Sequence, residues 1–145
     1  MIDPSLPVQA AVFAALTASA ALATAFGEPP RIFDRVPIDA AGRVTAAFPF
    51  VAIGEDQVTS EADACHDASS IFVTVHVWSR AVGKVEAKRI MAAVCLALDV
   101  KLTVAGFGVI AADVETGPQH LTDPDGLTSH SVVTFRYRLA PAANP

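Results

Sequence analysis

The residues with the most obvious chemical potential lie together in the middle of the chain. The run Asp63-Ala64-Cys65-His66-Asp67 combines a thiol, an imidazole and two carboxylates. A Cys and a His adjacent in sequence do not easily reach one tetrahedral ion, and no second pair follows at a zinc interval. Catalytic Cys–His pairs are usually assembled from distant segments. We therefore expect a solvated acidic loop here, with a metal site and a nucleophilic Cys–His site as the less favoured interpretations.

The remaining candidate groups do not combine into a catalytic set. His76 lies inside a strong strand pattern, which is typical of a hydrogen-bonded sheet residue, and His120 and His130 flank a turn without identifiable partners. The run Gly106-Phe107-Gly108 lacks the further glycine, the lysine and the following helix of a phosphate loop. Because no nucleophile, base and oxyanion donor occur together, the sequence predicts no catalytic residues, no metal, no cofactor and no enzyme.

Two arginines of the last predicted strand share one face. Arg136 and Arg138 are two residues apart, and successive side chains of a strand alternate between faces. They form either a solvated or ion-paired sheet face or the lining of a passage for nucleic acid.

Two helices are predicted from apolar periodicity. The first spans residues 5–26, with Ser5 or Asp3 as N-cap and Gly27 as a left-handed C-cap. The second spans residues 83–98, and one apolar arc of it should pack on a sheet. That arc consists of Ala87, Ile90, Met91, Val94, Ala97 and Leu98. A second apolar line interrupts its charged side and indicates another partner surface: Val85, Ala92 and Leu96.

Period-two patterns predict the strands. The strongest runs over residues 71–78, and the last, over 128–139, alternates apolar and polar residues like a half-exposed antiparallel strand. Shorter candidates are residues 31–36, 48–53, 102–104 and 109–111. Polar residues 55–70 are expected to be a long loop or an extended hairpin arm, and residues 115–127 a long loop. The chain thus predicts one α+β domain over residues 1–145, a mostly antiparallel sheet of four to six strands with two helices packed on one face.

Composition narrows the class of protein further. Hydrophobic residues make up 52% of the 145 residues and charged residues only 17%, against about 25% in ordinary domains. A chain with so few charged residues must expose apolar surface that other protein chains would bury, so an oligomer is expected. The net charge of −5 disfavours tight binding to nucleic acid. The uncharged N-terminal stretch lacks the positive start of a signal peptide, and polar residues interrupt it as a membrane span, so a cytosolic product is expected.

Several strings, in this order, resemble one protein family. They are residues 31–37 (RIFDRVP), 48–55 (FPFVAIGE) and 75–80 (VHVWSR), followed by 123–126 (DPDG) and 135–138 (FRYR). The chain is similar in these strings to the tail completion or tail terminator proteins of long-tailed bacteriophages and the related gene transfer agents.

The resemblance implies a structural virion protein without catalytic residues. Family members of this kind form a hexameric ring that caps the head-proximal end of the tail tube, stops tube growth and joins the tail to the head. The implied partners are further copies of the chain, the tail tube protein and a head–tail connector or neck protein. DNA would pass through as cargo, and no membrane is involved. The implied location is the tail–neck region of the particle, after assembly in the bacterial cytoplasm.

Candidate contact residues follow from this expectation. A closed ring has a heterologous interface and needs two different contact patches on each subunit. The candidates for contacts with a neighbouring subunit or the tube are Val85, Ala92, Leu96, Asp63, Asp67, Asp123 and Asp125. Six copies at −5 each would carry about −30, which would repel DNA weakly and let it pass without sticking.

Other functions remain open at this point. The first alternative is a different head–tail connector or neck protein. Less favoured are a small cytosolic enzyme centred on Cys65 and His66, and a small-molecule binding module, which would need a concave apolar pocket.

Overall fold

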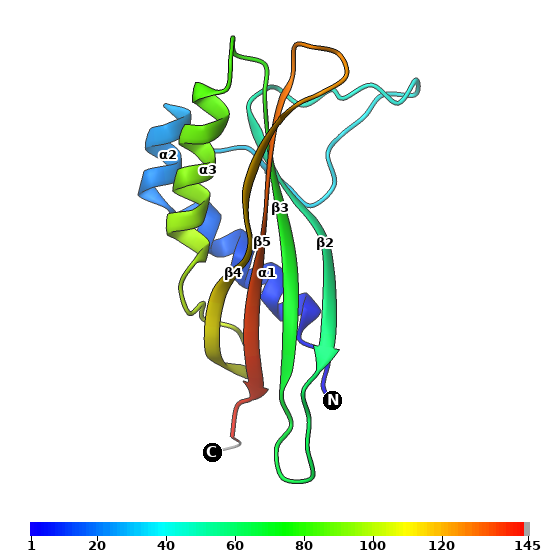
Figure 1. The fold of residues 1–145 in the computed structure, drawn as a ribbon, viewed down its shortest axis with the longest axis vertical. Helices are drawn as coiled ribbons and strands as arrows, with labels where there is room; N and C mark the ends of the chain where they lie inside the picture. The colour runs from blue at the N-terminus through cyan, green and yellow to red at the C-terminus, as the bar shows by residue number, and fades with distance from the viewer. Residues whose placement is uncertain (144–145) are drawn as a thin grey trace.

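The computed structural model describes residues 1–143 and places five strands and three helices in them (Figure 1). The helices are α1 (Ser5–Ala18), α2 (Ala20–Phe26) and α3 (Val85–Leu98), and the strands are β1 (Ile32–Phe33), β2 (Phe50–Ser60), β3 (Ser69–Ser79), β4 (Phe107–Thr122) and β5 (Ser129–Pro141). They form one sheet in the order β1-β2-β3-β5-β4. All neighbouring strands are antiparallel except β1 and β2, which are parallel.

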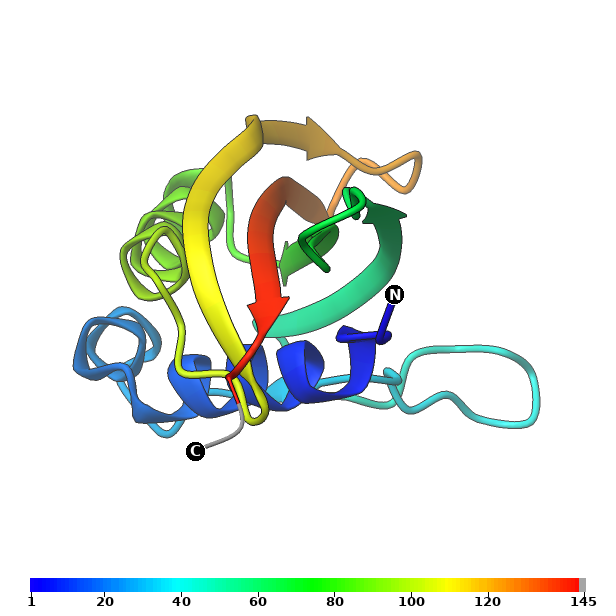
Figure 2. The same ribbon diagram turned by 90° about the horizontal axis from the view of Figure 1, so that it is seen from below.

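The helices cover one face of this sheet, which confirms the predicted α+β fold. α3 packs on β3 and β5, α1 packs on β2, and α2 lies beside α3 at the flank of the molecule (Figures 1 and 2). Seen from below, the sheet is strongly twisted, with its outer strands curling away from its centre (Figure 2).

The core forms where the alternating strands meet the helices. Ile71, Val73 and Val75 of β3 point toward the helices and are fully or almost fully buried, and register brings Val73 opposite Phe135 of β5. The predicted arc of α3 packs against them, with Ile90 and other members buried. Burial of this apolar surface, at about 25 cal/mol per Å², is the main stabilising contribution to the fold.

The helix predicted over residues 5–26 is instead two helices. The backbone of Ser19 is extended, with φ −72° and ψ 113°, and its hydroxyl oxygen accepts a hydrogen bond from the Leu22 amide at 3.1 Å. Val12 and Leu16 keep a spacing of four, whereas Leu22 comes six residues later. The break at Ser19 changes the direction of the helix axis, and Leu22 of α2 is also fully buried. Gly27 ends α2 as predicted, with φ 71°.

The two segments predicted as long loops are in large part strands, and residues 55–70 form the hairpin arm that was the alternative for them. β2 extends to Ser60 and β4 runs from Phe107 to Thr122, which leaves loops only at residues 61–68 and 123–128. β4 lies at the edge of the sheet, is shifted in register at three places, and exposes side chains of both faces. The far end of β2 is similarly exposed. Strands exposed on both faces carry no alternating apolar pattern, which explains the error.

The strand predicted over residues 102–104 is wrong for a different reason, because its alternating apolar side chains are buried without strand pairing. Leu102 and Val104 are buried, but Val104 makes only an isolated bridge with Phe107 before β4 begins. Within residues 1–143 no single helix has the length and apolarity to cross a membrane, although α1 and α2, bent by 61° at their junction, meet those criteria as a pair.

Candidate functional site

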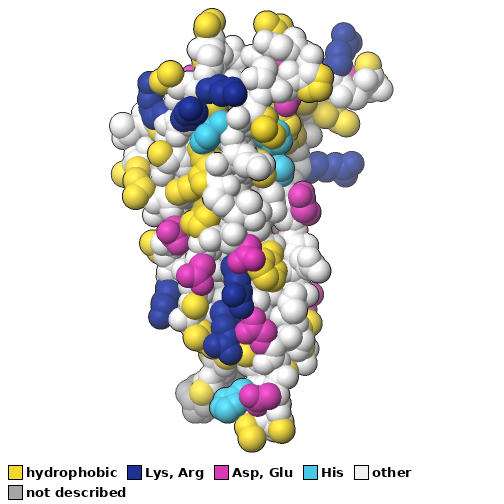
Figure 3. All heavy atoms as spheres, viewed as in Figure 1, with side chains coloured by type: hydrophobic (Ala, Val, Ile, Leu, Met, Phe, Trp, Pro, Cys, Tyr) yellow, Lys and Arg dark blue, Asp and Glu magenta, His cyan; other side chains and the backbone are white. Residues whose placement is uncertain are grey.

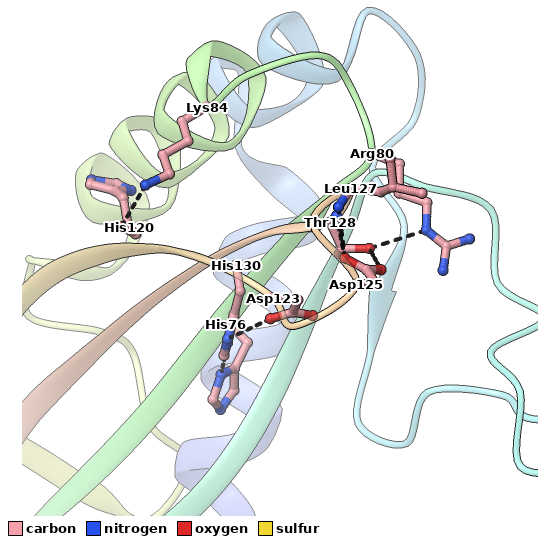
Figure 4. A network of polar contacts seen from close by, with 9 residues as sticks. All are labelled: His76, Arg80, Lys84, His120, Asp123, Asp125, Leu127, Thr128 and His130. Atoms are coloured by element: carbon pink, nitrogen blue, oxygen red, sulfur yellow. Dashed lines mark hydrogen bonds and ion pairs between the residues drawn. The ribbon is translucent and has the colours of Figure 1, made fainter.

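The sheet face turned away from the helices carries a cluster of aromatic and imidazole rings. Nδ1 of His76 lies 2.7 Å from Nε2 of His130 on the adjacent strand (Figure 4). The indole of Trp78 stacks on the His130 ring, with centroids 3.7 Å apart and planes 7° apart. Burial lowers the pKa of His76, and burial and the charge on His76 lower the pKa of His130. The pair therefore favours a neutral state.

A carboxylate lies beside the outer nitrogen of each ring. Oε2 of Glu55 is 3.9 Å from Nε2 of His76, and Oδ1 of Asp123 is 3.9 Å from Nδ1 of His130. Gly54 makes room for this arrangement, because a Cβ atom at that position would come within 2.7 Å of His76 Nε2. The result is a row of four titratable side chains drawn from β2, β3, β5 and the turn before β5.

A second polar cluster centres on Glu61. Its Oε1 accepts hydrogen bonds from the Ser70 hydroxyl and from Nη2 of Arg136 at 2.8 Å, and its Oε2 accepts one from Nε of Arg138 at 2.5 Å. These bonds lower the pKa of Glu61 to about 2. Arg136 and Arg138 thus form an ion-paired group on the open sheet face, and Lys, Arg and acidic side chains lie intermixed over the surface in Figure 3.

The four predicted contact acids lie in the two hairpin loops. Asp63 accepts hydrogen bonds from the amides of Cys65 and His66, both at 2.8 Å, and Asp67 lies 3.9 Å from the N-terminal amine. Asp125 accepts bonds from the backbone of Leu127 and Thr128 and from the Thr128 hydroxyl, which lower its pKa to about 2 (Figure 4). Asp123 is the carboxylate beside His130. Asp63 and Asp125 thus stabilise their turns, and all four acids place negative charge in the loops.

The predicted apolar line on α3 is exposed. Val85 is 67% exposed, Leu96 is 72% exposed, and Ala92 between them is exposed as well. Hydrophobic side chains are visible among basic ones on this helical flank (Figure 3). At the C-terminal end of α3 they border a shallow groove of about 570 Å³, lined by Ala92, Cys95, Leu96, Asp99 and Val100.

An apolar cavity of about 380 Å³ lies beside the ring cluster. Its walls are mostly Val36, Val44, Phe48, Phe50 and Trp78, and Arg80, Asp123, Asp125 and Thr128 line its rim. The guanidinium of Arg80 covers the Phe48 ring at 4.1 Å and donates to the Thr128 hydroxyl at 3.2 Å. The cavity is large enough for one or two apolar side chains.

The Cys65–His66 loop is exposed to solvent. Cys65 is exposed, and Nδ1 of His66 pairs with Asp63 at 3.1 Å. Among residues 1–143 no group of three or more His, Cys, Asp or Glu side chains is placed to hold a metal ion.

An ion-paired sheet face was one interpretation of Arg136 and Arg138, but the partners of these pairs were not predicted. The residues involved, Glu55, Glu61, His76 and His130, come from segments that meet only through strand pairing. The sequence indicated only that His76 and Trp78 lie on the same face of the strongest predicted strand, since they are two residues apart.

The chain is similar to one protein family and to solved structures of virion proteins. The family model of the tail completion protein gp17 matches residues 10–140. A chain in the virion of a native gene transfer agent particle superposes with a TM-score of 0.82 and 23% identity, covering 97% of this chain and 99% of that one. The gp17 protein of bacteriophage SPP1 superposes with a TM-score of 0.60 and 24% identity, covering 97% and 91%. A comparison with curated proteins found no match.

Proposed function

Since the chain belongs to the tail completion protein gp17 family, we propose that it is a structural component of a phage or gene transfer agent particle, located in the tail–neck region. The observation that carries this proposal is the family match over residues 10–140, which takes in most of the chain. In the proposed assembly, copies of the chain form a closed hexameric ring at the head-proximal end of the tail tube. The ring occupies the growing end of the tube, stops further addition and presents a surface to the neck.

The surface of the subunit supports side-by-side assembly. The segment from α1 through α2 contains no charged residue, yet Leu6 is 76% exposed and Phe13 is 46% exposed. The stripe on α3 adds further exposed apolar side chains. Apolar surface of this kind on a soluble chain is stabilised by burial against other protein. The exposed apolar side chains of α1 and of α3 are candidates for the heterologous contacts of a ring.

The two hairpin loops, which lie at opposite ends of the sheet, are proposed to contact neighbouring subunits or the uppermost ring of the tube (Figure 1). The loops at residues 61–68 and 123–128 carry Asp63, Asp67, Asp123 and Asp125, and turn hydrogen bonds hold the side chains of Asp63 and Asp125 in position. Edge strands such as β4 can also accept a strand from a neighbouring sheet. The negative charge of the subunit favours free passage of DNA through the ring, since it repels phosphates.

Deletion of loop residues 62–67 tests the tube-capping role. The deletion lies outside β2 and β3, so the chain should still fold, while tails should grow beyond their normal length. Electron microscopy of particles made with the variant measures this. Cys65→Ala is the matched control, which should leave particle yield and tail length unchanged. Tails of normal length in the deletion variant, or the chain located on the portal side of the neck, would contradict the capping role and favour a connector.

A further inference from the structure

We propose that a preformed hairpin, residues 37–45, of one copy of the chain docks into the groove at the C-terminal end of α3 in the next copy. This inference deepens the proposed ring, on which it rests, by assigning the two halves of the subunit contact. It rests on the hairpin's rigidity, the groove's lining and the placement of the two features on opposite flanks.

The hairpin is held in shape by its own bonds. The Asp39 amide donates to the Arg43 carbonyl at 2.8 Å, and the Thr45 amide donates to the Pro37 carbonyl at 3.0 Å. Oδ1 of Asp39 accepts further bonds from the amides of Ala41 and Arg43, both at 2.9 Å. A preformed element loses little conformational entropy when it docks.

The hairpin presents apolar side chains to solvent. Ile38 and Val44 face each other across an isolated antiparallel bridge, so their side chains lie on the same side of the hairpin. Ile38 is 57% exposed and Val44 is 41% exposed. The segment projects away from the sheet as the cyan loop in both ribbon views (Figures 1 and 2). Ile38 and Val44 lie near the base of the hairpin, and Val44 also lines the apolar cavity of its own subunit, so Ile38 is the side chain that we assign to the neighbouring groove.

The groove offers a matching surface. Its lining is mostly apolar, with Ala92, Leu96 and Val100, and Asp99 is the one charged residue in it. No basic residue lies in the last turn of α3, so the negative end of the helix dipole adds to the charge of Asp99. The hairpin brings the complementary charge, because the Arg43 side chain is 81% exposed despite its pairing with Asp39.

The two features lie on opposite flanks of the subunit. The hairpin projects on one side and α3 lies on the other, in the view of Figure 1 and again after a 90° turn in Figure 2. A single subunit therefore cannot satisfy the contact with its own groove. Head-to-tail repetition of such a contact is what closes a ring when the rotation between copies allows it.

Cross-linking in assembled particles tests the contact. The chain has two cysteines, and Cys65→Ser leaves Cys95 in the groove as the sole thiol. In this background, Ile38→Cys should produce covalent dimers and higher multimers after mild oxidation or treatment with a short bismaleimide. Val44→Cys provides a second position on the same side of the hairpin. The matched control is Leu127→Cys, which is also on a turn and 74% exposed, and should give none.

The outcomes separate this contact from the proposed function. Multimers that disappear when Cys95→Ala is added support docking in the groove. Particles that contain the chain at the tail end but give no multimers from either hairpin position overturn the docking and leave the ring intact. Absence of the chain from the particles overturns both. Ile38→Asp should also abolish incorporation of the chain while leaving its monomer folded, and normal incorporation would contradict the contact.

Discussion

Nδ1 of His76 lies 2.7 Å from Nε2 of His130 across two adjacent strands. One of these nitrogens must donate and the other accept, so this bond survives only while one ring is neutral at that position. With one extra proton, the pair can keep its bond and direct N–H groups toward Glu55 and Asp123 as well. With two extra protons, both facing nitrogens become donors and the bond is lost.

Acid should therefore destabilise the fold through these histidines. The pKa of each is lowered in the folded chain, so below 6.5 the unfolded chain binds more protons and the free energy of unfolding falls as pH drops. His76→Gln should reduce this fall between about pH 7 and pH 5. Urea unfolding followed by the fluorescence of Trp78, the sole tryptophan, measures it. His66→Gln, at an exposed loop position, is the control, and an unchanged pH dependence in His76→Gln would refute the prediction.

Gly54→Ala should lower the free energy of unfolding, because the new methyl group would collide with the imidazole ring of His76. The new Cβ would lie 2.7 Å from His76 Nε2 and 3.1 Å from the Thr74 carbonyl oxygen, so the imidazole has to move. We expect a loss of about 1–3 kcal/mol in the free energy of unfolding. Gly117→Ala, where a Cβ meets open space, should be close to neutral. Adding His76→Ala should recover part of the loss, and equal stability of the two glycine variants would argue against the close approach.

Glu61→Ala should remove a pH-dependent contribution to the free energy of unfolding. The carboxylate binds Arg136, Arg138 and Ser70, and its pKa falls from 4.5 to about 2 on folding. The stabilisation is thus fully present above pH 4.5 and is lost as pH falls toward 2. At neutral pH the variant should lose about 1 kcal/mol, since the cluster is partly exposed. Glu115→Ala, on the exposed edge strand, should lose almost nothing, and a Glu61 effect that persists undiminished at pH 2 would contradict this account.

Tyr137→Phe should weaken the junction between β5 and α3. The phenol donates to the carbonyl of Leu98, the last residue of α3, at 2.6 Å in a buried position. Removing the hydroxyl leaves that carbonyl without this donor and should cost about 1–2 kcal/mol in thermal or urea unfolding. In the wild-type chain burial raises the pKa of Tyr137, so its phenolate absorbance should emerge only when alkali unfolds the protein. Titration of the phenol near its usual pKa in folded protein would refute this burial.

The sequence by itself determined the elements with a buried face. Val73 and Val75 in β3, Ile90 in α3 and the αL glycine Gly27 were predictable because each reflects local periodicity or backbone conformation. The family resemblance was also carried by local strings. Of the exposed strand β4 only residues 109–111 were predicted, because solvent on both faces imposes no apolar alternation on the rest.

Only the tertiary structure decided which polar groups meet. Glu61 binds Arg136 and Arg138 across more than seventy residues of sequence, and His76 meets His130 because β3 and β5 pair in one particular register. A shift of one residue in that register would move every side chain of one strand to the opposite face. Such pairings depend on the packing of the whole core, which a strand's own residues do not encode, so the open sheet face and the projecting hairpin emerged from the structure alone.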